Sequence, residues 1–121
     1  MEGVAFAMRD SVEIAKSLGI AVKSTKICGG GAKSPIWKQI FSDVLGIPVQ
    51  SISVEEGPGL GAAMLAAVGC GTYHSVEEVA DAVVQVTETT EPDGCTHSRY
   101  NEKYAEFQEI YPALKAIHKG L

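Results

Sequence analysis

The chain has 121 residues, of which 45% are hydrophobic and 21% are charged, and its formal net charge at pH 7 is −5. This length and hydrophobic content can form one buried core, so we expect a single domain or a piece of a larger one, and we exclude a disordered tail. The acidic balance, without any cluster of lysine and arginine, argues against nucleic acid as a partner.

The cysteines and the apolar stretches indicate the compartment. Cys28, Cys70 and Cys95 stand far apart, and the first residues show no basic segment followed by an apolar one. We therefore expect neither a disulfide framework nor secretion, and the pattern favours a reducing cytoplasm. The longest strongly apolar stretch, residues 60–68, is far shorter than the roughly 20 residues that cross a bilayer, so no membrane partner is expected.

The first third of the sequence predicts a helix, a strand and a second helix. Apolar side chains recur at steps of three and four over residues 3–18, as in one stripe of a helix, and Gly19 is a typical helix end. Residues 20–28 mix β-branched and polar side chains and predict a strand that ends at glycines. Ser34 and Pro35 predict the next helix start, because serine caps free amides and proline suits the first helical position.

A unit of strand, helix and strand defines the fold class. A second strand is predicted at residues 47–52, and a parallel crossover is by far the commonest arrangement of such a unit. Residues 60–68 have hardly a polar atom and predict a helix buried closely against the sheet. The expected class is therefore α/β, with a short, mainly parallel sheet flanked by helices.

The last part of the sequence predicts two further helices and a loop. Ser75 and Glu78 match a capping box, which predicts a short helix. Residues 87–97 are polar and rich in turn formers and predict a surface loop, with a third strand over residues 83–87 left open. The final helix carries an apolar stripe that predicts packing on another element. Its residues are Tyr100, Tyr104, Phe107, Tyr111 and Leu114.

The predicted sheet is small for an independent domain. A sheet of two or three strands has marginal stability by itself, so we interpret the chain as part of a longer one. Strand edges without a partner favour self-association, which makes a homo-oligomer a further expectation.

The stretch Cys28-Gly-Gly-Gly-Ala-Lys-Ser-Pro35 is a candidate binding site. A phosphate-binding P-loop needs a glycine directly before its lysine, where Ala32 stands, so that hypothesis fails. The glycines lie between a strand end and a helix start, which offers unpaired N–H donors and a partial positive charge to a nucleotide phosphate or ribose. A tight structural turn is the alternative, and these residues alone leave both open.

A second glycine motif, Gly57-Pro-Gly-Leu-Gly-Ala62, satisfies the dinucleotide-binding pattern. Pro58 lacks an amide where a pyrophosphate needs donors, and no acidic strand end lies at the expected distance unless Glu88 serves at longer range. We expect these small residues to allow close packing of a helix on the sheet, with NAD binding as the alternative.

The histidines do not predict a metal site. Cys95 and His97 form too short a cluster for four ligands, and His74 and His118 are isolated. We expect all three histidines to be ordinary surface residues.

Three blocks of sequence follow one another in a fixed order, at residues 2–10, 28–48 and 55–67. Together they resemble the carboxyl-terminal domain of the FGGY carbohydrate kinases, over residues 2 to about 114. The resemblance implies an actin-like ATPase (ribonuclease H-like) fold that ends in a helix. It further implies that residues 1–121 are the carboxyl-terminal fragment of the second, nucleotide-binding domain of a two-domain kinase, without the amino-terminal sugar-binding domain.

The resemblance also implies a site and an activity. Gly30, Gly31 and Ala32 would line the adenosine and α-phosphate side of an ATP site, with Gly29 and Ser34 adjacent. The implied reaction transfers the γ-phosphate of ATP to a pentulose, D-xylulose first, with ribulose, gluconate and glycerol as other substrates. Mg²⁺ would be bound mainly through the nucleotide and by residues outside this chain.

No catalytic residue is expected in the chain. In these kinases an aspartate of the amino-terminal domain acts as the base towards the sugar hydroxyl, so the resemblance implies that this chain alone is inactive. Asp10 and Asp43 lie within predicted helices, where we expect solvated or paired roles. A non-catalytic interaction module of the same fold is the alternative function.

Overall fold

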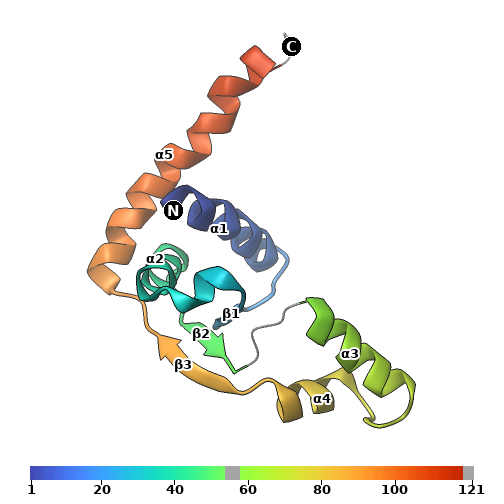
Figure 1. Ribbon diagram of the computed structural model, residues 1–121. Helices are drawn as coiled ribbons and strands as arrows, with labels where there is room; N and C mark the ends of the chain where they lie inside the picture. Colours follow the sequence, from blue (N-terminus) through green and yellow to red (C-terminus); the bar gives the residue numbers. More distant parts are fainter. Residues whose placement is uncertain (54–57, 119–121) are drawn as a thin grey trace.

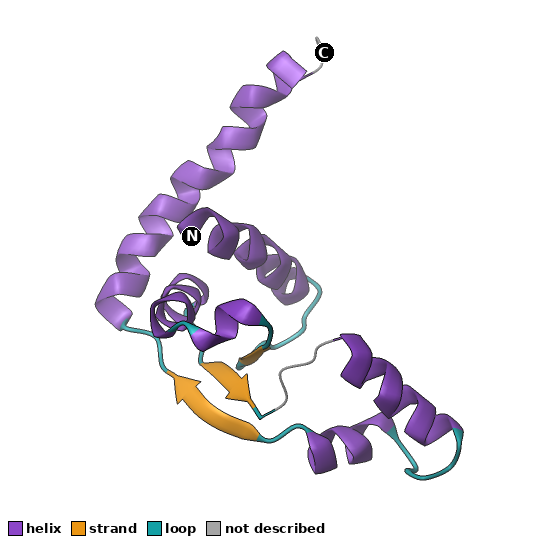
Figure 2. Cartoon of the chain, in the orientation of Figure 1, coloured by secondary structure: helices purple, strands orange, loops and turns teal. Residues whose placement is uncertain are grey.

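The computed structural model describes residues 1–53 and 58–118, which fold into helices around a small sheet (Figures 1 and 2). The elements follow the order α1 (Glu2–Ser17), β1 (Thr25–Ile27), the 3₁₀ helix η1 (Gly30–Lys33), α2 (Pro35–Leu45), β2 (Val49–Ile52), α3 (Pro58–Gly69), α4 (Val76–Val83), β3 (Val86–Thr90) and α5 (Gly94–His118). The predicted α/β class and the predicted helix at the carboxyl end are confirmed.

The sheet has the strand order β1-β2-β3 and is mixed. β1 pairs with β2 in parallel, with Thr25 opposite Val49, which confirms the strand, helix and strand unit. β2 pairs with β3 in the antiparallel direction, so only one of the two pairings is parallel. β1 is shorter than the predicted residues 20–28 because it is an edge strand and only Thr25–Ile27 find partners on β2.

The predicted loop at residues 87–97 is wrong at both ends. β3 extends to Thr90, although four of its five residues are exposed. Its polar composition reflects an exposed edge strand, in which threonine is favoured, rather than a loop. α5 begins at Gly94, directly after Asp93, whose carboxylate accepts a 2.7 Å hydrogen bond from the backbone N–H of Thr96. Asp93 therefore caps α5.

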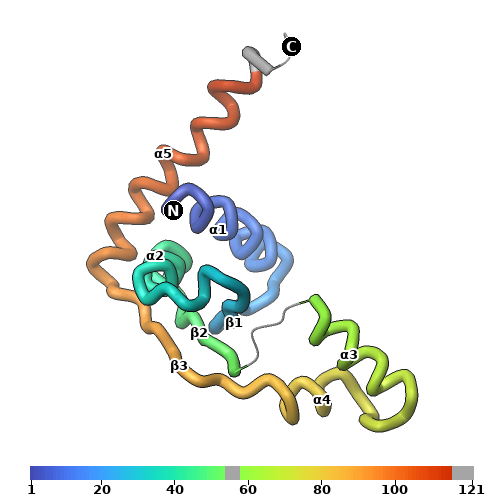
Figure 3. The backbone as a smooth tube through the Cα atoms, viewed as in Figure 1, coloured from blue at the N-terminus to red at the C-terminus, as the bar shows by residue number. Residues whose placement is uncertain are grey.

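The core lies where α1, α2 and α5 meet. Phe6 of α1 is buried together with Ala5, Val44 and Tyr104. The ring of Phe6 lies between 5.4 and 6.0 Å from three rings of α5, those of Tyr100, Tyr104 and Phe107. The predicted packing of the aromatic stripe is thus confirmed for its first half. Figure 3 shows α5 continuing beyond α1, and there Tyr111 is 68% exposed.

The apolar stripe that predicts α1 does not face this core. Val4 and Met8 are about half exposed, at 54% and 50%, whereas Ala5 and Phe6 are buried. An aromatic ring buries more apolar area than these aliphatic side chains, so contact with the rings of α5 decides which face of α1 turns inward.

The expected burial of α3 against the sheet is wrong. No residue of α3 is buried, and Leu65 is 63% exposed. Figure 1 shows α3 beside α4, apart from α1, α2 and α5. Among the described elements, α3 lies against α4 rather than on the sheet. No described helix combines the length and the hydropathy that crossing a bilayer requires.

Polar side chains join α2 to β3 and to the residue before α5, and they join α1 to α5. The Lys38 ammonium lies 2.5 Å from a carboxylate oxygen of Glu88 on β3. Asp43 accepts a 2.8 Å hydrogen bond from the backbone N–H of Asp93, and Asp10 accepts one from the Tyr104 hydroxyl at 2.5 Å. The two aspartates are therefore paired, as the sequence predicts.

Candidate functional site

The glycine stretch forms a tight connection between β1 and α2. Gly29 has a φ of +85°, a left-handed conformation that a side chain disfavours, and the four residues Gly30–Lys33 form η1. Ser34 then caps α2, since its hydroxyl accepts a 3.3 Å hydrogen bond from the backbone N–H of Trp37. The predicted helix start at Pro35 is confirmed, whereas the 3₁₀ helix was not foreseen.

Some of the amides in this connection are already used. The N–H of Ala32 donates to the carbonyl of Gly29 at 3.0 Å, and the N–H of Ser34 donates to the carbonyl of Gly31 at 3.1 Å. Within the described ranges the amides of Gly30, Gly31 and Ile36 donate no hydrogen bond. These three N–H groups, next to the positive end of α2, remain available to an anion.

A small cavity of about 90 Å³ lies beside the connection, where β1 and β2 both end. The residues that line it are Ile27, Cys28, Gly29, Ala32, Lys33, Ser51 and Ile52. Gly29 and Ala32 were predicted as site residues; of the others, Gly30 is adjacent to Gly29 in the chain, and Ser34 follows the lining residue Lys33. The position matches the general rule that α/β sheets bind ligands beyond the carboxyl ends of their strands.

Ser51 is a member of this cavity that the sequence did not suggest. Its hydroxyl oxygen is buried and has no hydrogen-bond partner in the part of the chain that the structure describes. The only signal was indirect, because Ser51 belongs to a predicted strand parallel to the one that ends at the glycines.

Gly31 lines a different and larger space, an apolar groove of about 370 Å³. The groove runs between α1, β1 and α2, and its apolar lining includes Val4, Met8, Val12, Trp37 and Phe41. Gly31 thus lines the apolar groove and Gly29 and Ala32 line the small cavity, while Ile27 and Cys28 line both.

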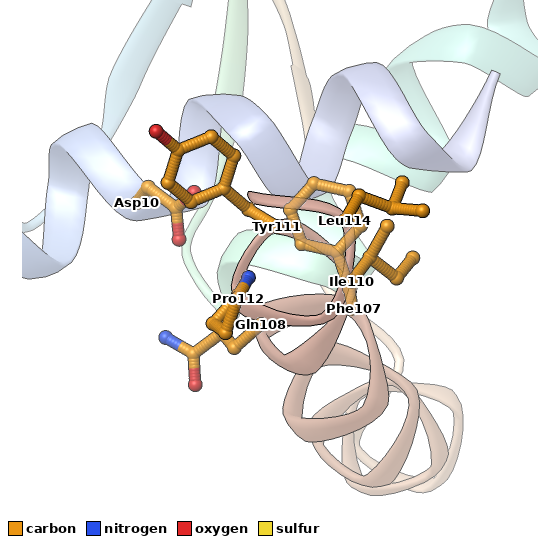
Figure 4. A pocket seen from close by; sticks show the side chains of 7 residues that line it. All are labelled: Asp10, Phe107, Gln108, Ile110, Tyr111, Pro112 and Leu114. Atoms are coloured by element: carbon orange, nitrogen blue, oxygen red, sulfur yellow. The ribbon is translucent and has the colours of Figure 1, made fainter. Parts of the chain in front are cut away.

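A cavity of about 510 Å³ is remote from the predicted site. Figure 4 shows its lining, in which Asp10 of α1 meets side chains of the second half of α5: Phe107, Gln108, Ile110, Tyr111, Pro112 and Leu114. None of the predicted nucleotide-binding residues lines it.

The described residues contain no group of three or more histidine, cysteine, aspartate or glutamate side chains that could hold a metal ion. The three cysteines are exposed and free. His97 departs from the expectation of an ordinary surface residue, because its ring is half-buried and its Nδ1 lies 2.7 Å from the carbonyl oxygen of Asp43. The side chain of His118 lies outside the described residues.

The second glycine motif lies partly outside the described residues, which exclude Gly57. Pro58 is the first residue of α3, and Gly59 lies in its first turn.

Comparison with known proteins shows which protein family the chain resembles. Residues 1–70 match the model of the C-terminal domain of the FGGY family of carbohydrate kinases. The chain is 34% identical over 121 residues to a xylulose kinase of Staphylococcus epidermidis. This alignment covers all of this chain and 24% of that kinase.

Solved structures agree with this match. The structure of xylulose kinase from Rhodospirillum rubrum superposes with a TM-score of 0.74 and 31% identity, over 96% of this chain and 24% of that one. Glycerol kinase from Plasmodium falciparum, solved with ADP, superposes with a TM-score of 0.70 over 90% of this chain and 22% of that one, but at 21% identity it shares only the fold.

The chain thus spans about a quarter of the length of these proteins. The three sequence blocks, the α/β fold and the family model all agree, and the chain belongs to the FGGY family of carbohydrate kinases, with residues 1–70 matching the C-terminal domain of that family.

Proposed function

We propose that this chain is the carboxyl-terminal, ATP-binding part of a kinase that transfers the γ-phosphate of ATP to a pentulose, with D-xylulose as the first candidate. The observation that carries the proposal is the glycine connection between the ends of β1 and β2 and the amino terminus of α2, in a chain of this family. Similarity to xylulose kinases supports the choice of sugar.

The nucleotide would be held mainly by backbone groups. The free N–H groups of Gly30 and Gly31 would donate to a phosphate or ribose oxygen, and the positive end of α2 would stabilise the negative charge. Glycine at these positions lets the ligand approach the main chain closely. Ala32 and Ser34 would serve by fixing the turn, since their own N–H groups are used within it. Pro35 has no side-chain donor for adenine.

Mg²⁺ and the catalytic base would come from outside this chain. The residues that line the small cavity include no carboxylate, and the described residues hold no cluster of metal ligands. The described residues therefore do not fit the role of a magnesium site, and the ion would be bound by the phosphates of the nucleotide and by other residues. Because phosphoryl transfer depends on positioning and charge stabilisation together, we expect the isolated chain to be inactive.

Calorimetric titration of the chain with ADP and with ATP, with and without Mg²⁺, tests the nucleotide site. Gly30→Asp adds a carboxylate where a side chain would meet nothing within 4 Å, so it introduces charge without a clash. We expect this variant to weaken ADP binding by about tenfold or more, because like charges repel. Gly3→Asp places the same charge at the start of α1, also in open space, and is expected to bind as the native chain does.

Other outcomes would identify the alternatives. Binding of NAD in preference to ADP would favour the dinucleotide hypothesis. No heat with any nucleotide would contradict an autonomous site and favour an interaction module. The sugar is tested separately, by joining the chain to the preceding part of a xylulose kinase and assaying D-xylulose against ribulose, gluconate and glycerol.

A further inference from the structure

Trp37 occupies the space beside Gly31 that a side chain there would need. A Cβ atom on Gly31 would lie 2.6 Å from Nε1 and 2.7 Å from Cδ1 of the indole. Gly29 and Gly30, in contrast, have no atom within 4 Å of such a position. Of the three glycines, only Gly31 therefore has the indole in the place of a side chain, and Gly31 carries a free N–H group.

One contact of the Trp37 backbone and one of its indole ring hold this residue in place. The backbone N–H of Trp37 donates to the hydroxyl of Ser34, and the ring packs edge-on against Phe41, with 5.1 Å between ring centroids. Ser34 in turn donates its own N–H to the carbonyl of Gly31 at 3.1 Å. Gly31, Ser34 and Trp37 thus form a closed set of contacts that ties the glycine stretch to the first turn of α2.

Trp37 lines a different space from the small cavity of the proposed nucleotide site. It lines the apolar groove with Gly31, and it is not among the residues of the small cavity at the strand ends. We propose that Trp37 is a positioning residue for the nucleotide. Its indole packs against the backbone of Gly31 from the apolar groove and holds the amides of η1 in one orientation. This inference rests on the proposed function of the glycine stretch.

The stretch needs such support for a physical reason. A 3₁₀ helix has poorer hydrogen-bond geometry than an α-helix, and glycine has more backbone freedom than any other residue. Without a neighbouring side chain, the free N–H groups of Gly30 and Gly31 would sample several directions. Ordering them would then oppose nucleotide binding, since binding to a mobile loop includes the cost of fixing it.

The test compares ADP affinity in variants of matched stability. Trp37→Leu removes the indole, and Trp37→Phe keeps a smaller ring. Ile40→Ala is the control, because Ile40 packs on the core from the same helix and lines neither the groove nor the small cavity. We expect Trp37→Leu to weaken Mg-ADP binding on the order of tenfold, because Trp37 and Gly31 are in contact and residues in contact are energetically coupled. The loss should be smaller in Trp37→Phe, and Ile40→Ala should show none.

Gly31→Ala completes a double-mutant cycle with Trp37→Leu. The added methyl group is expected to weaken ADP binding in the native background, where it meets the indole, and to have little further effect once the indole is gone. Additive losses, or equal losses in Trp37→Leu and Ile40→Ala at matched melting temperature, would overturn the inference.

A measurement without any substitution covers the case in which a variant does not fold. Trp37 is the single tryptophan of the chain, so its fluorescence emission should change when Mg-ADP is added. Unchanged emission at saturating ADP would also overturn the inference while leaving the nucleotide site standing. Absence of ADP binding to the native chain would instead refute the proposed function, and this inference with it.

Discussion

His97 of α5 lies directly over Gly46, the residue that ends α2. Gly46 has a φ of +67°, and a Cβ atom placed on it would lie 2.7 Å from Nε2 of the His97 ring. The Nδ1 of the same ring is 2.7 Å from the carbonyl oxygen of Asp43 in the last turn of α2. Position 46 therefore requires glycine for two reasons: its backbone is left-handed, and His97 of α5 leaves no space for a side chain.

Replacement of Gly46 by alanine tests this relationship. We expect Gly46→Ala to lower the free energy of unfolding by about 2 kcal/mol, because a side chain strains the left-handed conformation and also displaces His97. Gly3→Ala is the control, since a side chain there meets nothing within 4 Å, and it should change stability by less than about 0.5 kcal/mol. Urea denaturation measures both, and equal effects would contradict the argument.

Phe6 is expected to be the largest single contributor to the packing of α1 on α5. Phe6→Ala removes a buried ring that meets three aromatic rings of α5, and we expect a loss of about 3 kcal/mol or more in the free energy of unfolding. Ile14→Ala, at a position 61% exposed on the same helix, should cost less than about 0.5 kcal/mol. A small effect of Phe6→Ala in the urea transition would show that the core lies elsewhere.

Helix starts were predictable because their signals are local. Ser34 caps α2 and Ser75 caps α4 by accepting backbone N–H groups three residues later, as the sequence predicts. One detail differs in the capping box: the Glu78 carboxylate accepts from the backbone N–H of His74, at 2.8 Å, rather than from that of Ser75.

Features that depend on distant neighbours were not predictable in the same way. β3 is polar because it is exposed, and only its pairing with β2 makes it a strand. The buried face of α1 is chosen by the rings of α5, which lie far away in the sequence. The start of α5 did have a local signal, since Asp93 and Thr96 have the spacing of a helix cap.

The candidate site shows the same division. The sequence predicted a glycine connection between a strand end and a capped helix, which depends on neighbouring residues alone. It did not predict the contact of Trp37 with Gly31, which involves the unforeseen 3₁₀ helix, nor the hydroxyl of Ser51 that has no partner among the described residues.

The cap of α5 predicts a loss of stability in acid. Hydrogen bonds from the backbone and then the side chain of Thr96 lower the pKa of Asp93 below its usual value of 3.8. A lowered pKa favours the ionised form in the folded state, so this stabilisation is present above pH 3.8 and is lost as the pH falls through the folded value. Melting curves followed by circular dichroism should show a weaker dependence on pH below 3.8 in Asp93→Asn than in the native chain. Parallel curves would contradict the role of this carboxylate.

The contact between Tyr104 and Asp10 predicts the opposite dependence in alkali. Burial, and then the hydrogen bond to Asp10, raise the pKa of Tyr104 from its usual 10.0 to about 12. The neutral phenol is therefore favoured in the folded state, so its stabilisation is complete below pH 10.0 and is lost as the pH rises towards 12. Tyr104→Phe keeps the ring that packs on Phe6 and removes only the hydroxyl.

We expect the melting temperature of Tyr104→Phe to fall less steeply above pH 10.0 than that of the native chain. Part of the dependence should remain, because burial and Glu2 raise the pKa of Tyr100 to about 12 as well. Ultraviolet absorbance of the phenolates gives a direct check: the variant should lose one of the late-titrating groups. An identical alkaline transition in both proteins would show that the hydroxyl of Tyr104 does not contribute to the docking of α5 on α1.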